Sequence, residues 1–319
     1  MPTHVRTKDF VSVLDFEPQE LEACLNLAAR VKRDRRLGTD APTANALSGS
    51  HVALLFEKPS LRTISTFEIA IRELGGDVIT PYPVAALSER EPAVDVARNL
   101  ERWVRCVVMR TYAHATLLEF AAAAPKLHVV NALSDTEHPC QALADLQTLK
   151  EVWGDWKGRT MAFIGDGNNV ATSLAQAAVM LGAHFHIASP DGYALPAKVV
   201  DQAMRVARHG AAIRLFTDPF EAVKNVGAVY TDVWTSMGQE AEAAERKKAF
   251  EGYQVTEALM QHAAPEAVFM HCLPAHRNEE VATDVFESPA SVVFDQAENR
   301  LHSQKALLLT LMAGRSAGA

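Results

Sequence analysis

The stretch from His51 to Gly76, HVALLFEKPSLRTISTFEIAIRELGG, decides the fold because it contains one complete strand-to-helix unit. His51–Phe56 is an apolar run that we expect to form a buried strand. In the turn that follows, Pro59 suits the entry of a helix and Ser60 is able to cap it. An apolar stripe with helical spacing comes next and ends at Gly75-Gly76; its members are Ile64, Phe67, Ile71 and Leu74.

The same alternation of short strands and amphipathic helices continues along the chain, which is typical of parallel α/β sheets. In the first half, the strands are expected at His51–Phe56, Asp77–Thr80, Arg105–Met109 and Leu127–Val130. In the second half, they are expected at Met161–Ile164, His184–Ala188, Ala212–Phe216, Ala228–Thr231 and Ala267–His271. The sequence therefore predicts two doubly wound parallel-sheet domains.

Two further helices frame these domains. A helix from His138 to about Trp153 precedes the expected boundary, near Gly154–Gly158, which divides the chain into residues 1–150 and 151–295. The last helical stretch, from Gln296 to about Met312, follows the final strand of the second half and could pack on either domain. Ligands of doubly wound sheets bind beyond the carboxyl ends of the strands, so functional residues are expected there.

Composition excludes several classes of protein. The 319 residues carry a net charge of −8, which argues against a nucleic-acid or membrane-surface partner. No apolar run is long enough to span a membrane, and the first residues lack the apolar core of a signal peptide. The four cysteines show no C-x-x-C pairing, which fits free thiols in a reducing compartment. We therefore expect a cytoplasmic protein.

The first candidate binding motif is the turn between the strand and the helix, Phe56–Thr63. The amides of the first helical turn, the hydroxyls of Ser60 and Thr63, and Arg62 would converge on one anion, and phosphate suits them. An ordinary capped helix with a surface arginine explains the same residues equally well. Arg110, at the end of another strand of the same half, becomes informative beside Arg62.

The next motif, His138-Pro139-Cys140-Gln141, opens the helix that ends the first half. A neutral imidazole and a carboxamide are able to hydrogen-bond a carbonyl oxygen and an amide. The structural alternative is a capping histidine with a surface glutamine.

In the second half, Gly165-Asp166-Gly167-Asn168-Asn169 follows a strand and suggests a dinucleotide site. The fingerprint fails at its third glycine, where Val170 stands, although Asp191 lies at a plausible separation for a ribose contact. The asparagines could equally bind a small polar ligand.

Three later motifs also follow strands or open the last helix. Asp232-Val233-Trp234-Thr235-Ser236-Met237-Gly238 offers a carboxylate for an ammonium group, with a hydroxyl four residues later. His271-Cys272-Leu273-Pro274 is explained equally by a buried histidine and an inert core thiol. Glu298-Asn299-Arg300 could be an exposed charged turn.

Together these motifs resemble one family, the transcarbamylases, and within it the ornithine carbamoyltransferases. The shared motifs run in order between about His51 and Ala306: S-x-R-T, the later arginine, H-P-x-Q, D-x-W-x-S-M-G-Q, H-C-L-P and D-Q-A-E-N-R. D-x-x-x-S-M-G and H-C-L-P separate the ornithine enzymes from the aspartate enzymes.

The resemblance implies transfer of the carbamoyl group of carbamoyl phosphate to the side-chain amine of L-ornithine, giving L-citrulline and phosphate, without cofactor or metal. The residues that would contact carbamoyl phosphate are Ser60, Leu61 (through its backbone), Arg62, Thr63, Arg110, His138, Gln141, Cys272, Leu273 and Arg300. Those of this set expected to act in catalysis are Arg62, Arg110, His138, Gln141, Cys272 and Arg300. Ornithine would be held by Asn169, Asp232, Ser236 and Met237.

The resemblance also implies an assembly and a division of labour. Residues 1–150 would bind carbamoyl phosphate, with residues 296–319 packing back on them, and residues 151–295 would bind ornithine. The chain would form a homotrimer, or a multiple of trimers, and would act in arginine metabolism.

Two features depart from the family. Ile64 stands where a further arginine is usual, and the loop Pro81–Arg90 lacks the glutamine that relatives extend into a neighbouring subunit.

Other functions remain alternatives at this level. A nicotinamide-dependent oxidoreductase would use Gly165–Asn169 but would leave the arginines of the first half unexplained. A non-catalytic paralogue would bind carbamoyl phosphate poorly. Within the same chemistry, the acceptor could be acetylated or succinylated ornithine, or putrescine.

Overall fold

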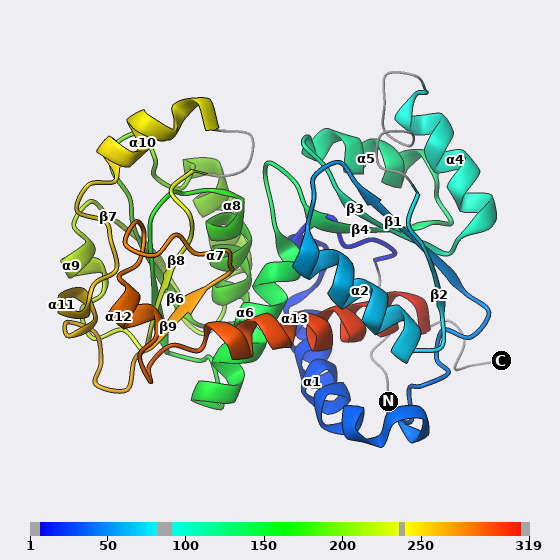
Figure 1. Cartoon of the computed structure of the whole chain (residues 1–319), viewed down its shortest axis with the longest axis horizontal. Coiled ribbons are helices and arrows are strands. Elements are labelled where there is room, and N and C mark those ends of the chain that lie inside the picture. The colour runs from blue at the N-terminus through cyan, green and yellow to red at the C-terminus, as the bar shows by residue number, and fades with distance from the viewer. Residues whose placement is uncertain (1–6, 82–90, 236–239, 314–319) are drawn as a thin grey trace. The chain divides into compact units, whose positions relative to one another are not determined.

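The computed structural model describes residues 7–81, 91–235 and 240–313, and the chain forms two compact units (Figure 1). Unit 1 comprises Met1–Gln147 and Glu298–Ala319, and unit 2 comprises Thr148–Ala297. Both divisions fall inside helices, the first in α6 (Pro139–Trp153) and the second in α13 (Val293–Leu308). The units are therefore joined by continuous helices at both crossings.

Unit 1 is built on a parallel sheet with the strand order β2-β1-β3-β4. Its strands are β1 (His51–Phe56), β2 (Asp77–Ile79), β3 (Cys106–Arg110) and β4 (His128–Leu133). Its other helices are α1 (Pro18–Asp34), α2 (Leu61–Glu73), α4 (Ala93–Trp103) and α5 (His114–Ala123), with short 3-10 helices at Val13–Asp15 and Arg35–Asp40. The register pairs Phe56 with Arg110, which brings the start of α2 and Arg110 to one sheet edge.

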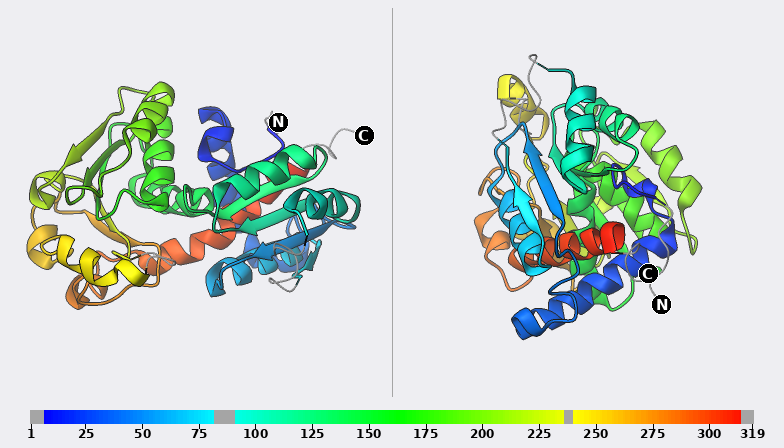
Figure 2. Two further views of the ribbon diagram at one scale, coloured as in Figure 1. Left: turned by 90° about the horizontal axis from the view of Figure 1, so that it is seen from above. Right: turned by 90° about the vertical axis from the view of Figure 1, so that its right-hand side faces the viewer.

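Helices cover both faces of this sheet. The core on one face joins β1, β3 and β4 to α4 and α5 through side chains such as Leu55, Met109, Val129, Leu100 and Phe120. Figure 2 shows α4 and α5 on this side and α1, α2 and α13 on the other. Within unit 1, the end of α13 is attached to α2 by an ion pair in which Lys305 Nζ lies 2.9 Å from Glu73 Oε2.

Unit 2 contains a second parallel sheet with the strand order β7-β6-β5-β8-β9. Its strands are β5 (Thr160–Ile164), β6 (His184–Ala188), β7 (Ile213–Phe216), β8 (Ala228–Thr231) and β9 (Val268–His271). Its helices are α7 (Asn169–Leu181), α8 (Ala197–Val206), α9 (Pro219–Ala222), α10 (Ala243–Ala249), α11 (Glu257–Met260) and α12 (Thr283–Phe286). One core cluster packs β5, β8 and β9 against α9, α11 and α12, and α7 packs against α8.

The predicted fold class, two doubly wound parallel-sheet domains, is confirmed, and every predicted strand is present with ends displaced by no more than a few residues. Strand order reverses between β1 and β3 in unit 1 and between β5 and β8 in unit 2, which are the positions where such sheets bind ligands. Among the described residues, no helix has the length and hydropathy needed to cross a membrane.

Candidate functional site

The start of α2 lies beside the end of β3 in unit 1. Ser60 caps α2 and its Oγ accepts a hydrogen bond from the Thr63 amide at 3.4 Å. Arg110, a residue that is 6% exposed, donates from its guanidinium to the same Oγ at 3.4 Å. The backbone amides of a first helical turn, together with an arginine, form a place where an anion is stabilised.

Arg300 of α13 connects two of the predicted motifs. Its guanidinium donates to Thr63 Oγ1 at 2.7 Å and to Gln141 Oε1 at 2.9 Å. The carboxamide of Gln141 in turn donates to Asp145 Oδ1 at 2.8 Å, which fixes its orientation. We call the set Ser60, Thr63, Arg110, His138, Gln141 and Arg300 the Arg300 cluster. Within unit 1 it gathers residues from α2, β3, α6 and α13.

His138 is the titratable group of this cluster. It is 4% exposed, and burial, followed by the positive charges of Arg300 and Arg110, holds its pKa well below the ordinary value of 6.5. The ring is therefore neutral at pH 7. A neutral imidazole offers one donor and one acceptor, as an uncharged carbonyl or amide ligand requires.

The remaining predicted residues of this motif are more exposed. Leu61 is 80% exposed, so its backbone amide is what it offers at the start of α2. Arg62 and Ile64 are partly buried, one on either side of the buried Thr63.

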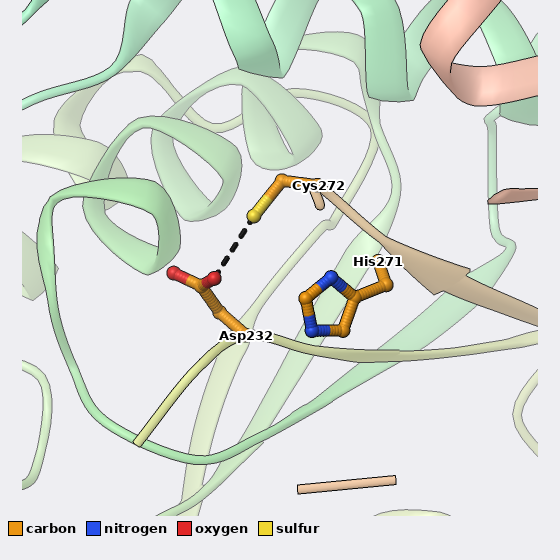
Figure 3. Close-up of side chains that lie close together, drawn as sticks. All are labelled: Asp232, His271 and Cys272. Carbon is orange, nitrogen blue, oxygen red and sulfur yellow. Dashed lines mark hydrogen bonds between the residues drawn. The ribbon is translucent and has the colours of Figure 1, made fainter. Parts of the chain in front are cut away.

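A second polar group gathers at the carboxyl edge of the sheet of unit 2. Asn168 caps α7 through hydrogen bonds from the Val170 and Ala171 amides, both at 3.0 Å. Its amide nitrogen donates to Asp232 Oδ2 at 2.9 Å. The Cys272 thiol donates to Asp232 Oδ1 at 2.9 Å, and Figure 3 shows it directed at that carboxylate beside His271. We call Asn168, Asp232 and Cys272 the Asp232 cluster.

The loop after β9 holds Cys272 in place. Leu273 has a φ of +59°, a left-handed conformation that is uncommon for a leucine. Its amide donates to His271 Nδ1 at 2.9 Å, and His271 Nε2 lies 3.2 Å from Glu280 Oε1. His271 and Glu280 are both fully buried. Their contact depends on how the loop folds back, so sequence spacing gave no signal for Glu280.

The structure argues against a dinucleotide at the glycine-rich turn. The Gly167 amide, which would face a pyrophosphate, donates to Tyr193 O at 2.8 Å. A Cβ added at Gly167 would lie 2.4 Å from Leu195 N, so the loop after β6 already fills the space against this glycine. Gly167, the second glycine of the motif, is packed against the protein's own backbone and not against an open site. The motif therefore no longer favours a nicotinamide-dependent oxidoreductase.

Among the residues that the structure describes, two groups of side chains have ligand atoms within 4.8 Å of one another, as a metal ion would require: Asp232, His271 and Cys272, and His276, Glu279 and Glu280. The sequence showed no metal-ligand spacing. The first group forms where the ends of β8 and β9 meet at one sheet edge, whereas the second lies within the single segment 276–280. In the first group, the thiol donates to Asp232 and His271 accepts from a backbone amide. The protein itself therefore supplies partners for these atoms.

The structure thus brings the predicted residues together in two sets. Unit 1 unites six of them in the Arg300 cluster. Unit 2 joins Asp232 to Cys272, with Asn169 as the first residue of α7 and Leu273 in the loop after β9. Ser236 and Met237, and the loop 82–90 with its missing glutamine, lie outside the described residues.

Comparison with known proteins covers almost the whole chain. Residues 8–151 match the carbamoyl-P binding domain of aspartate/ornithine carbamoyltransferase, and residues 157–311 match its Asp/Orn binding domain. The chain is 47% identical over 314 residues to the ornithine carbamoyltransferase of Symbiobacterium thermophilum, covering 98% of this chain and 100% of that one. It is 48% identical over 306 residues to that of Thermus thermophilus, covering 96% and 97%.

A solved structure shares this similarity. Ornithine carbamoyltransferase from Pyrococcus furiosus superimposes with a TM-score of 0.92 and is 44% identical, with 97% of this chain and 98% of that one covered.

Proposed function

The chain belongs to the aspartate/ornithine carbamoyltransferase family, and from that premise we propose that it transfers the carbamoyl group of carbamoyl phosphate to the side-chain amine of L-ornithine, giving L-citrulline and phosphate. The observation that carries this proposal is the position of Arg300, which donates to Thr63 and to Gln141. Three motifs far apart in the sequence thereby meet in one cluster of neutral and cationic donors.

Unit 1 binds carbamoyl phosphate in this proposal. The phosphate lies at the start of α2, where Ser60, Thr63, the Leu61 amide, Arg62 and Arg110 bind its oxygens. Such charge-assisted contacts to a helix N-terminus are strong and directional.

The carbamoyl end of the same substrate meets the rest of the Arg300 cluster. Arg300 donates to the carbonyl oxygen, and His138 and Gln141 contact the carbonyl and the amide. His138 is neutral in the folded protein, so it is able to donate to the oxygen or accept from the NH₂ group.

Unit 2 binds ornithine. Asp232 attracts the α-ammonium group, and Asn169, Ser236 and Met237 hold the remainder of the α-amino and α-carboxylate groups. Cys272 and Leu273 contact the side-chain amine and the carbamoyl group. The hydrogen bonds from Asn168 and Cys272 keep the Asp232 carboxylate in a fixed orientation and support this assignment.

The chemistry requires positioning and electrostatic stabilisation. The neutral amine attacks the carbamoyl carbon, and a C–N bond forms while negative charge develops on the carbonyl oxygen. Arg300 and His138 stabilise that oxygen. The C–O bond to phosphate then breaks with its electron pair on the leaving oxygen, where Arg62, Arg110 and the start of α2 stabilise the charge. The former amine gives its proton to the departing phosphate. Holding both reactants supplies the orientation that an uncatalysed encounter lacks.

The remaining parts of the proposal concern setting and assembly. The enzyme acts in arginine metabolism, as the resemblance to the family implies. A location in the cytoplasm is supported by four free cysteines, three of them buried, which suit a reducing compartment. It forms a homotrimer or a multiple of trimers. Ile64 takes the place of the usual arginine, and we assign it to packing against the helix stripe because it is partly buried.

A product assay tests the proposed reaction. Purified protein is incubated with carbamoyl phosphate and, separately, with ornithine, N-acetylornithine, N-succinylornithine and putrescine, and ureido product is detected. Citrulline from ornithine alone supports the proposal. Product from another amine reassigns the acceptor, and no product from any amine, with no binding of carbamoyl phosphate, supports a non-catalytic paralogue.

A further inference from the structure

Arg246 is an arginine that the proposed reaction does not use, yet it is among the most buried charges of unit 2. It belongs to the charged run Glu245-Arg246-Lys247-Lys248, and side chains of these types are mostly exposed in proteins. In the structure, the Arg246 side chain is 5% exposed, whereas Lys247 and Lys248 are exposed. A buried guanidinium is stable only with good partners, so its contacts indicate what it holds.

Most partners of Arg246 come from separate loops of unit 2, and its Nη1 also lies 3.6 Å from Oε2 of the exposed Glu242 at the start of α10. Its Nε donates to Trp234 O at 2.6 Å, and its Nη2 forms an ion pair with Asp166. The guanidinium also lies over the rings of Tyr193, 4.8 Å from the centroid, and Phe250, at 5.7 Å. Arg246 therefore connects α10 to the loop after β5, the loop after β6 and the segment after β8.

These contacts flank the Asp232 cluster on both sides. Asp166 stands two residues before Asn168, and Trp234 stands two residues after Asp232. Between them, Asn168 donates to Asp232 at 2.9 Å. One guanidinium thus holds the Asp166 side chain on one side of the hydrogen bond that orients the Asp232 carboxylate, and the Trp234 carbonyl on the other side.

The ion pair also controls the charge beside that carboxylate. The Asp166 side chain is only 14% exposed. Burial raises the pKa of Asp166, Arg246 lowers it, and the nearby charges of Asp232 and Glu242 raise it further. Without Arg246, an ammonium group arriving at Asp232 would meet a second, unpaired acidic group.

We propose that Arg246 is a positioning residue for ornithine: it fixes residues 165–168 and 232–234 so that Asp232 presents its carboxylate, and it neutralises Asp166 so that the amino acid meets a single carboxylate. This inference rests on the proposed assignment of ornithine to Asp232. Lysine is a poor substitute, because one ammonium group has neither the planar geometry nor the separate nitrogens that reach Asp166 and Trp234 together.

The experiment compares Arg246→Met and Arg246→Lys with Lys248→Met, which removes the same charge from an exposed position of the same helix. Steady-state kinetics give kcat and KM for ornithine, and calorimetry gives the affinity for carbamoyl phosphate.

Arg246→Met should raise the ornithine KM by about tenfold or more, because a small misplacement of a binding group costs on the order of 10²-fold. Arg246→Lys should recover part of this loss, and Lys248→Met should behave as the parent. Carbamoyl phosphate affinity should not change in any variant.

A double-mutant cycle with Asp166→Asn tests the route of the effect. If Arg246 acts partly through Asp166, the two substitutions should not act independently. The ornithine KM of the double variant should then rise by less than the product of the two fold-increases seen in the single variants. An unchanged ornithine KM in folded Arg246→Met, or an equal loss in Lys248→Met, would overturn the proposal.

Hydrogen exchange supplies a readout that does not depend on the reaction. In Arg246→Met, the amides of Gly167 and Val233 should exchange faster than in the parent, while amides of the unit 1 sheet should not. If the parent makes no citrulline, the proposed function fails, but this comparison still decides whether Arg246 orders the two segments. If Arg246→Met does not fold, Arg246→Lys is measured in its place, and unchanged exchange at both amides would contradict the positioning role.

Discussion

His138 shows how a single residue is adapted by its surroundings. Burial and two arginine charges lower its pKa, so the folded protein keeps the ring neutral where an unfolded chain would begin to protonate it. Neither effect is visible in the motif H-P-x-Q, because both depend on Arg110 and Arg300 lying close in the folded unit. The sequence identified the residue, and the structure supplied its protonation state.

A pH titration of stability checks that state. Well above pH 6.5 both folded and unfolded chains hold His138 neutral. Below it, the unfolded chain binds a proton that the folded chain excludes until much lower pH. The free energy of unfolding should therefore fall on acidification, by up to about 1.4 kcal/mol per pH unit for this one group. Urea unfolding between pH 7 and 5 should show a shallower decrease for His138→Gln than for the parent. Equal slopes would place the proton elsewhere, for instance on His114, His186 or His302, whose pKa values are also lowered.

Arg110 provides a second residue-scale prediction. Arg110→Ala should weaken carbamoyl phosphate binding by about 1.5–3 kcal/mol, because a charge-assisted contact is lost in a buried place. Calorimetry measures the affinity directly. The matched control is Arg72→Ala, which removes an exposed arginine from the last turn of α2. Unchanged affinity in Arg110→Ala would remove this residue from the proposed phosphate site.

At the scale of elements, the strands were predictable because most of them are short runs rich in apolar residues. Their carboxyl ends were therefore also predictable as the place where Arg110, Asp232 and Cys272 stand. The contacts that form when helices pack were not predictable. The Arg300–Thr63 hydrogen bond joins residues that are 237 positions apart in the sequence. Arg246 is buried although it lies in a run of charged residues. The ligand-binding roles of all these side chains stay predictions.

The start of α7 allows its structural and functional parts to be separated. Asn168→Ala removes the cap acceptor and should destabilise the protein by about 1 kcal/mol. Asn168→Ser keeps a capping oxygen and should have nearly the stability of the parent. Neither variant is able to donate to Asp232 as asparagine does, so both should raise the ornithine KM. Denaturant unfolding and steady-state kinetics measure the two effects. Normal ornithine kinetics in Asn168→Ser would show that the Asn168–Asp232 hydrogen bond serves the helix alone.

At the scale of the whole molecule, the expected assembly rests on the resemblance to the family. Light scattering of the purified protein at micromolar concentration should give three times the chain mass, or a multiple of that value. The chain mass is 34.8 kDa, so a trimer corresponds to about 104 kDa. A single species at the mass of one chain would contradict the proposed trimer without bearing on the reaction.

The division of unit 1 into two sequence segments has a consequence for biosynthesis. Arg300 lies after the whole of unit 2 in the chain, although its partners Thr63 and Gln141 precede that unit. Domains generally fold as they emerge from the ribosome, amino-terminal parts first. The sheet of unit 1 would thus be translated early, whereas its proposed substrate cluster gains its central cation only near the end of translation. A nascent chain that stalls or is cleaved before residue 300 would keep most of both sheets but lack this arginine, so interrupted synthesis should yield inert protein instead of a partly active enzyme.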